Sequence, residues 1–105
     1  MKVHFIGISG IGMSAAALLA KDLGFIVSGS ADTENDRIVL LKNRGIEVFI
    51  GHRSANVKNP DMVVYTNAVS EQNEELKTVR AEEIPAFPRL IFLGRILPRY
   101  PKPVI

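Results

Sequence analysis

The sequence predicts an α/β domain with an open, mostly parallel sheet of about five strands and helices on both faces. Runs of β-branched and aromatic residues alternate with helix-like segments along the 105 residues, and this alternation indicates strands joined by right-handed crossovers. The first strand runs directly into a glycine turn at 7–12, which opens a helix. A strand, a glycine turn and a helix in this order are typical of a Rossmann-like domain.

The predicted strands are the short runs rich in β-branched and aromatic residues. In chain order they are 3–8, 25–27 with its end at 28–30, 46–50, 62–65 and 84–87. The first is apolar almost throughout, which suits a strand buried on both faces of a parallel sheet. The fifth is expected to be short, because Pro85 has no N–H to donate to a ladder.

The first two predicted helices are defined by their ends. Residues 11–23 are rich in Ala and Leu, and Gly24 follows them as a C-terminal stop. Residues 34–44 are expected to form the second helix, with Asp32 or Thr33 as its N-cap.

The last two predicted helices are defined by apolar residues at helical spacing. Residues 71–83 form the third, with Leu76 and Val79 facing inward. The fourth has Pro88 in its first turn and ends before Pro98. Its apolar stripe is expected to be Leu90, Leu93 and Leu97.

Composition excludes several classes of function. The net charge of +2, from 13 basic and 11 acidic residues, is too balanced to suggest nucleic-acid binding. The absence of cysteine excludes disulfides, thiolate catalysis and Cys-based zinc sites. We expect a cytoplasmic protein with no metal site of its own.

An uncharged stretch, 3–20, follows Lys2 and resembles a signal peptide or a short membrane span. Its three glycines would each destabilise such a helix by about 1 kcal/mol relative to alanine. They also stand at the spacing of a nucleotide-binding turn. We therefore interpret the stretch as a nucleotide loop and expect no membrane association.

The glycine turn is the main candidate site. Gly7 and Gly12 match the first and third glycines of the G-x-G-x-x-G fingerprint, whereas Ser9 stands at the middle position and Gly10 follows it. Main-chain N–H groups and the positive end of a helix dipole would meet there. The turn therefore predicts a phosphate or diphosphate site, the alternative being a turn that only permits tight packing.

Polar residues follow other strands at the same expected edge of the sheet, where ligands of such folds bind. At the end of the second strand, Ser30 or Asp32 is expected to reach a ribose or a base. His52 follows the third strand, and the fourth is followed by Thr66, Asn67 and Ala68. His4 lies inside a strand and is interpreted as a packed core residue.

Two sets of charged residues have simpler explanations. We interpret Glu71, Glu74 and Glu75 as a solvated helix face without histidine partners for a metal. Arg89 near a helix start is a candidate for phosphate, whereas Arg95 and Arg99 are expected to be surface charges. No Ser-His-Asp arrangement and no G-x-x-x-x-G-K-[ST] loop is legible, so we expect no catalytic residues in this chain.

Several blocks together resemble the start of the Mur ligase family. They keep the order and spacing of that family over essentially the whole chain, and they are 4–14, 27–30, 45–52, 66–69 and 73–74. The chain departs from the family at Ser9, where glycine is usual, and at Ala31, where aspartate is usual, with Asp32 one place later. Asn73 is also commonly followed by proline, and here by Glu74.

The resemblance implies a Rossmann-like first domain that holds the UDP part of UDP-N-acetylmuramate. In the family, a second domain carries the ATP phosphate loop and a third closes over the amino acid, here expected to be L-alanine. ATP and magnesium activate the muramoyl carboxylate as an acyl phosphate, which the amine attacks. Because the sequence stops at 103–105, in what resembles the strand before that phosphate loop, we expect one domain, 1–105, of a three-domain ligase.

The resemblance also implies roles for the candidate residues. The diphosphate would be cradled by Ser9, Gly10, Ile11 and Gly12. Ser30 and Asp32 would face uracil or ribose. The remaining wall would be lined by His52, Thr66, Asn67 and Ala68. Two alternatives are an NAD(P)-binding module, against which Ser9 and Ala31 count, and a structural or interaction domain.

Overall fold

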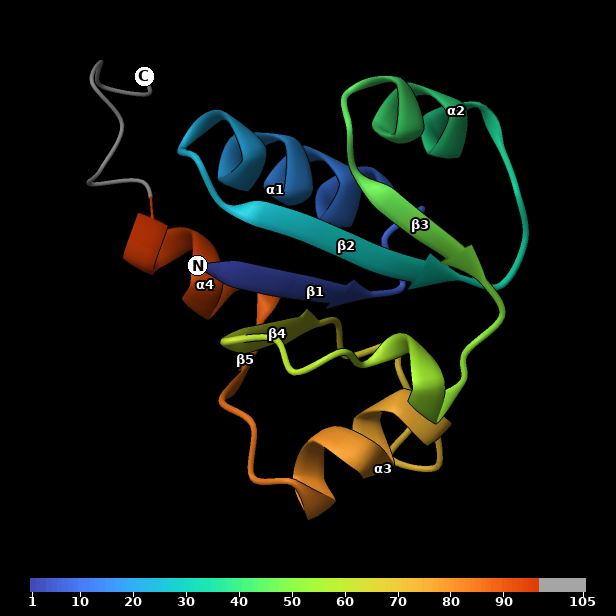
Figure 1. Cartoon of the computed structure of the whole chain (residues 1–105), viewed down its shortest axis with the longest axis vertical. Helices are drawn as coiled ribbons and strands as arrows, with labels where there is room; N and C mark the ends of the chain where they lie inside the picture. The colour runs from blue at the N-terminus through green and yellow to red at the C-terminus, as the bar shows by residue number, and fades with distance from the viewer. Residues whose placement is uncertain (97–105) are drawn as a thin grey trace.

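The computed structural model describes residues 1–96, in which five strands form one parallel sheet (Figure 1). The strand order is β3-β2-β1-β4-β5, and all four pairings are parallel. The strands are β1 (Lys2–Ile6), β2 (Ile26–Ala31), β3 (Glu47–Ile50), β4 (Met62–Tyr65) and β5 (Ala86–Pro88). The order reverses between β1 and β4, and such a switch point is where open α/β sheets bind ligands.

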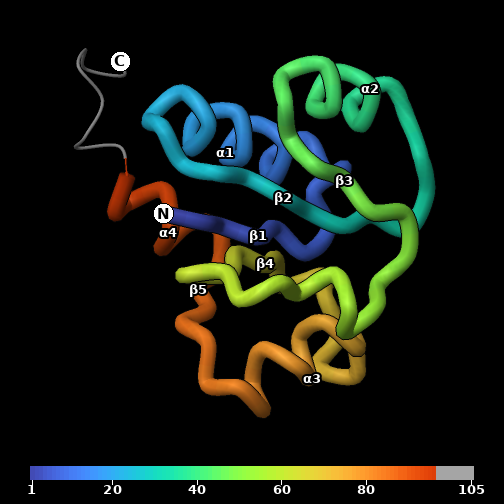
Figure 2. Tube along the Cα trace, viewed as in Figure 1, coloured from blue at the N-terminus to red at the C-terminus, as the bar shows by residue number. Residues whose placement is uncertain are grey.

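Four α-helices connect or follow these strands within the same residues. They are α1 (Ile11–Asp22), α2 (Asp36–Asn43), α3 (Glu74–Ala81) and α4 (Arg89–Ile96), with a 3₁₀ turn η1 (Ser54–Asn56) before β4. Helices α1 and α2 lie on the opposite side of the sheet from α3 (Figures 1 and 2). The predicted Rossmann-like architecture is therefore confirmed. No helix in residues 1–96 has the length and apolarity that a membrane span requires.

Each face of the sheet has its own apolar layer. Under α1 and α2, the core includes Phe5 and Phe25 from the sheet side and Phe92 from α4. The rings of Phe5 and Phe92 meet edge to face with their centroids 5.5 Å apart. On the other face, Ile6 and Val63 pack with two residues of α3, Leu76 and Val79. These two layers fix the strand ends that form the site.

The glycine turn is tied to the neighbouring strand. The N–H groups of Gly7 and Ile8 both donate to the carbonyl oxygen of Ser30, at 2.9 and 2.8 Å. Gly7 has a φ of +86°, a left-handed conformation that favours glycine. This bend ends β1 at Ile6, two residues earlier than the sequence predicts.

We expect Gly29→Ala to destabilise the fold by about 1–3 kcal/mol, the usual range for overpacking a core. A Cβ on Gly29 would lie 2.5 Å from Cδ1 of Ile8 and 2.9 Å from the carbonyl oxygen of Phe5. Ile8 would have to shift, and with it the glycine turn. Urea denaturation followed by circular dichroism measures the effect, and an unchanged midpoint would contradict it.

Helix boundaries and faces differ from the predictions in several places, and α3 begins at Glu74, three residues later than predicted. Asn35 caps α2 by accepting from the N–H of Ile38, so neither Asp32 nor Thr33 has the predicted capping role. Pro88 ends β5, and α4 begins at the next residue. In α4 the buried residues are Phe92 and Ile96, while Leu90 is 71% exposed, so its assignment to the inner face was wrong. Leu93 is partly buried against the core, as predicted. Leu97, Pro98, Arg99 and the strand-like stretch at 103–105 lie outside the described residues.

Candidate functional site

A cavity of about 560 Å³ opens at the carboxyl ends of the central strands. Four segments far apart in the sequence line it: the glycine turn, the residue after β2, the loop after β3 and the segment after β4. Among the lining residues are Ser9, Gly10, Asp32, His52, Thr66 and Ala68. The structure therefore brings together, at the switch point, six of the residues predicted from sequence.

The start of α1 presents to this cavity main-chain donors that have no hydrogen-bond partner within residues 1–96. Gly10 is the N-cap, with an extended backbone at φ −66° and ψ 152°. The N–H of Ser14 donates to the carbonyl oxygen of Gly10 at 2.8 Å and makes the first intrahelical hydrogen bond. The N–H groups of 11–13 precede that bond and point out of the helix start, and its first turn has no acidic residue. This arrangement suits an anion.

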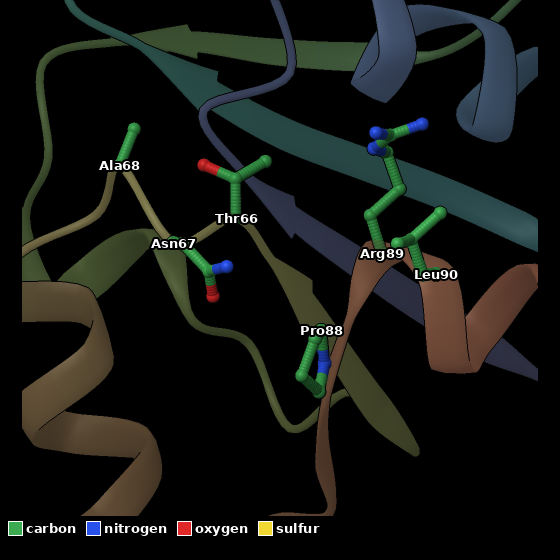
Figure 3. A pocket seen from close by; sticks show the side chains of 6 residues that line it. All are labelled: Thr66, Asn67, Ala68, Pro88, Arg89 and Leu90. Carbon is green, nitrogen blue, oxygen red and sulfur yellow. The ribbon is translucent and has the colours of Figure 1, made fainter.

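A second hollow of about 320 Å³ continues from the cavity between the segment after β4 and the start of α4 (Figure 3). Arg89 extends from α4 toward α1, and its guanidinium packs over Gly12, where a Cβ would lie 2.7 Å from Cζ. Within residues 1–96, Arg89 has no acidic partner within ion-pair distance. Its positive charge therefore adds to that of the helix start.

His52 stands between two carboxylates at the other side of the cavity. The N–H of Gly51 donates to the carbonyl oxygen of Ala31 at 2.7 Å, which brings the loop after β3 to the end of β2. Nε2 of His52 lies 3.0 Å from Oδ1 of Asp32, whose side chain is 87% exposed. Nδ1 of His52 lies 2.9 Å from Oγ of Ser30 and 3.4 Å from Oε2 of Glu75.

Glu75 is fully buried, so the prediction that it belongs to a solvated helix face was wrong. Its Oε1 accepts from Nε2 of His4 at 2.6 Å and from the hydroxyl of Ser30 at 2.9 Å. Its Oε2 accepts from Nδ2 of Asn56 at 3.0 Å and from the N–H of Arg53 at 3.2 Å. Glu71 and Glu74 are exposed, as predicted.

The environment of Glu75 favours its ionised form. Burial by itself would raise the pKa of Glu75, but hydrogen bonds from His4, Asn56 and Ser30 and the charge interaction with His4 lower it. The net direction is down, so this carboxylate is negatively charged around neutral pH. An ionised carboxylate only accepts hydrogen bonds, and four donors match its four lone-pair positions.

The remaining predicted residues occupy different places in the site. His4 is buried in the core, as expected, and also bonds Oγ of Ser28 at 2.8 Å. Ser30 is buried behind His52, so its direct contact with a ligand stays a prediction. The side chain of Ile11 is 73% exposed, and only its main chain belongs to the helix start. Asn67 lines the second hollow with Arg89.

Of two residues of the polar network that the sequence reasoning missed, one has a sequence signal and the other has none. Glu75 lies four residues before the inward-facing Val79 and one before the inward-facing Leu76, which places it on the buried side of a helix. Asn56, in η1, has no comparable signal because irregular turns have no periodicity. No group of three or more His, Cys, Asp or Glu side chains suited to hold a metal occurs in the part of the chain that the structure describes.

Comparisons with known proteins point to one family. Residues 2–101 match the model of the family described as Mur ligase family, catalytic domain. The chain is 43% identical to the UDP-N-acetylmuramate–L-alanine ligase of Acetivibrio thermocellus over 99 residues, which are 94% of this chain and 21% of that protein. It is 47% identical to the ligase of the same name from Clostridium tetani over 96 residues, which are 91% of this chain and 21% of that protein.

Solved structures agree with these relatives. The UDP-N-acetylmuramate-alanine ligase of Thermotoga maritima superposes with a TM-score of 0.90 at 41% identity, covering 94% of this chain and 23% of that one. A murein peptide ligase of Psychrobacter arcticus superposes with a TM-score of 0.88 at 27% identity, and the match covers 94% of this chain and 21% of that one. The chain thus spans about a fifth of the length of the curated relatives it matches.

Proposed function

The chain belongs to the Mur ligase family, and we propose that it binds the UDP part of UDP-N-acetylmuramate for a ligase that joins L-alanine to this substrate. That reaction belongs to the synthesis of peptidoglycan precursors. The observation that carries the proposal is the anion site at the start of α1, where main-chain N–H groups open on the larger cavity and the guanidinium of Arg89 packs over Gly12 beside them.

The geometry supports a division of the ligand between two parts of the site. The diphosphate lies against the N–H groups of 11–13 with Arg89 beside it, because both supply positive charge. The uridine lies in the larger cavity near Asp32 and His52, whose side chains offer polar contacts. Ser9 lines the larger cavity directly before the N-cap of α1 and has a hydroxyl to donate to a phosphate oxygen.

We assign ATP and magnesium to other domains of a three-domain ligase, of which this chain is the UDP-sugar-binding domain. The 105-residue sequence has no G-x-x-x-x-G-K-[ST] loop to cradle ATP. When bound, ATP and magnesium supply the activation of the carboxylate that forms the amide bond. The residues of this chain bind and orient the nucleotide end of the substrate, and they touch neither nucleic acid nor a membrane.

Calorimetric titration of the 105-residue chain tests the proposal. UDP-N-acetylmuramate and UDP are expected to bind, and NAD is expected to give no heat beyond dilution. Binding of NAD alone would support a dinucleotide-binding module instead. Absence of binding by all three ligands would contradict the proposal and leave a structural domain.

We expect Arg89→Gln to weaken UDP binding by about tenfold, since one charge-assisted hydrogen bond is worth roughly 1.5–3 kcal/mol when fully made. Arg89 flanks the helix start, so its loss removes charge without changing the cavity near His52. Arg44→Gln is the matched control, because Arg44 is an exposed residue at the C-terminal end of α2. Equal affinities of the two variants would contradict a role for Arg89.

A further inference from the structure

We propose that Glu75 is a positioning residue that keeps a proton on Nδ1 of His52, acting through the single hydroxyl proton of Ser30. Glu75 touches no ligand, because it is fully buried and reaches the cavity only through these two neighbours. The consequence for ligand choice, described below, rests on the proposed function. The proton position itself does not.

The hydroxyl of Ser30 lies between Glu75 and His52. Its oxygen lies 2.9 Å from Oε1 of Glu75 and 2.9 Å from Nδ1 of His52. A carboxylate has no proton to give, so Ser30 must donate its only proton to Glu75. The hydroxyl oxygen is then left with lone pairs toward His52.

The proton on the imidazole ring of His52 follows from that arrangement. A lone pair on Oγ of Ser30 is satisfied only if Nδ1 of His52 carries a proton and donates it. The other carboxylate oxygen, Oε2 of Glu75, lies 3.4 Å from the same nitrogen and favours the same arrangement. In the neutral ring, Nε2 is then the unprotonated nitrogen.

Polar and charged groups face both nitrogens of the ring. Asp32 faces Nε2, Glu75 and Ser30 face Nδ1, and His4 bonds Glu75 from the far side. In the charged ring, Nε2 also carries a proton and donates it to Asp32. In the neutral ring, Nε2 has a lone pair, which it presents to the cavity when the exposed side chain of Asp32 turns away. A neutral His52 therefore accepts a hydrogen bond from an N–H or O–H of the ligand, as a uracil imide or a ribose hydroxyl would supply.

Glu75→Gln is the substitution that isolates this effect. The carbonyl oxygen of the new amide is held by the N–H of Arg53 and by Asn56, so its NH₂ group faces Ser30 and Nε2 of His4. His4 accepts from this NH₂ once its own ring proton is on Nδ1, where Oγ of Ser28 accepts it. The NH₂ donates to Oγ of Ser30, which then turns its own proton toward Nδ1 of His52. The neutral ring must move its proton to Nε2, and the acceptor at the cavity is lost.

Nitrogen chemical shifts of the imidazole rings, measured by NMR on the ¹⁵N-labelled 105-residue chain over a range of pH, test the proton position without any ligand. The chain has two histidines, and a His52→Gln variant assigns their signals. In the wild-type chain we expect the neutral ring of His52 to carry its proton on Nδ1. In Glu75→Gln we expect Nδ1 to become the unprotonated nitrogen when the ring is neutral, whereas Glu74→Gln, an exposed neighbour, should match the wild type.

An unprotonated Nδ1 in the wild-type chain would overturn the proposal, and so would an unchanged ring in a folded Glu75→Gln variant. Should that variant fail to fold, the wild-type measurement decides alone. Titration with UDP adds a separate result: Glu75→Gln is expected to bind about tenfold more weakly than Glu74→Gln, the effect of one lost hydrogen bond. Absence of UDP binding by the wild type contradicts the proposed function and leaves the proton assignment to the NMR result.

Discussion

Replacing Gly10 with valine is expected to weaken UDP binding by at least about 100-fold while the chain stays folded. Gly10 lines the cavity directly before the donors of α1, so a branched side chain there occupies the approach to the N–H groups of 11–13. Each hydrogen bond to a charged group contributes roughly 1.5–3 kcal/mol to the binding free energy. Excluding the diphosphate from two such bonds therefore removes about twice that amount.

The fold is expected to survive because the backbone at Gly10 is one that any residue adopts. Its φ is −66°, and a Cβ would meet only the carbonyl oxygen of Gly7 at an ordinary 3.9 Å. Gly94→Val is the matched control, since a Cβ at Gly94 in α4 meets nothing within 4 Å. Calorimetry with UDP measures the affinities, and thermal unfolding by circular dichroism checks that both variants fold. A folded Gly10→Val variant with wild-type affinity would show that the diphosphate lies elsewhere.

The sheet was predictable because its evidence is local. Each strand contains or adjoins a short run of apolar residues, and the glycine turn between β1 and α1 has a characteristic spacing. The helix faces were less predictable. In α4, leucines at helical spacing suggested the inner face, but the pairing of Phe92 with Phe5 determines the rotation of the helix. An aromatic contact between residues 87 positions apart leaves no periodic signal.

The candidate site, too, was predictable only in part. Residues that end strands, such as Asp32 and His52, could be placed at one edge because parallel strands all end there. The buried network behind them could not, because it joins β1, β2, η1 and α3 through a carboxylate that resembles its exposed neighbour in sequence. A cluster of three glutamates is ordinarily a solvated surface. The spacing of Glu75 to Val79 indicates the buried side of the helix, but only the packing of α3 against the sheet shows which donors meet its carboxylate.

Glu75→Ala is therefore expected to destabilise the chain by about 3–5 kcal/mol, the usual result of removing one member of a buried charged network. The change leaves four donors, from His4, Ser30, Asn56 and Arg53, without their acceptor. Glu74→Ala, which removes an equal charge from the same helical turn, is the control and should change stability by less than about 0.5 kcal/mol. Urea denaturation at neutral pH distinguishes them, and equal losses would contradict a structural role for the buried carboxylate.

The same substitution should change how stability depends on pH. Because the pKa of Glu75 in the folded chain is below its ordinary value of 4.5, the folded state binds fewer protons than the unfolded state between those two values. The stability that this group contributes is complete above about pH 4.5 and is lost as the pH falls through the lower, folded value. Glu75→Ala lacks the titrating group, so its free energy of unfolding should fall less steeply with acid than that of the wild type or of Glu74→Ala. Acid titrations of unfolding with parallel slopes for all three chains would mean that the buried carboxylate is not held ionised by its four donors.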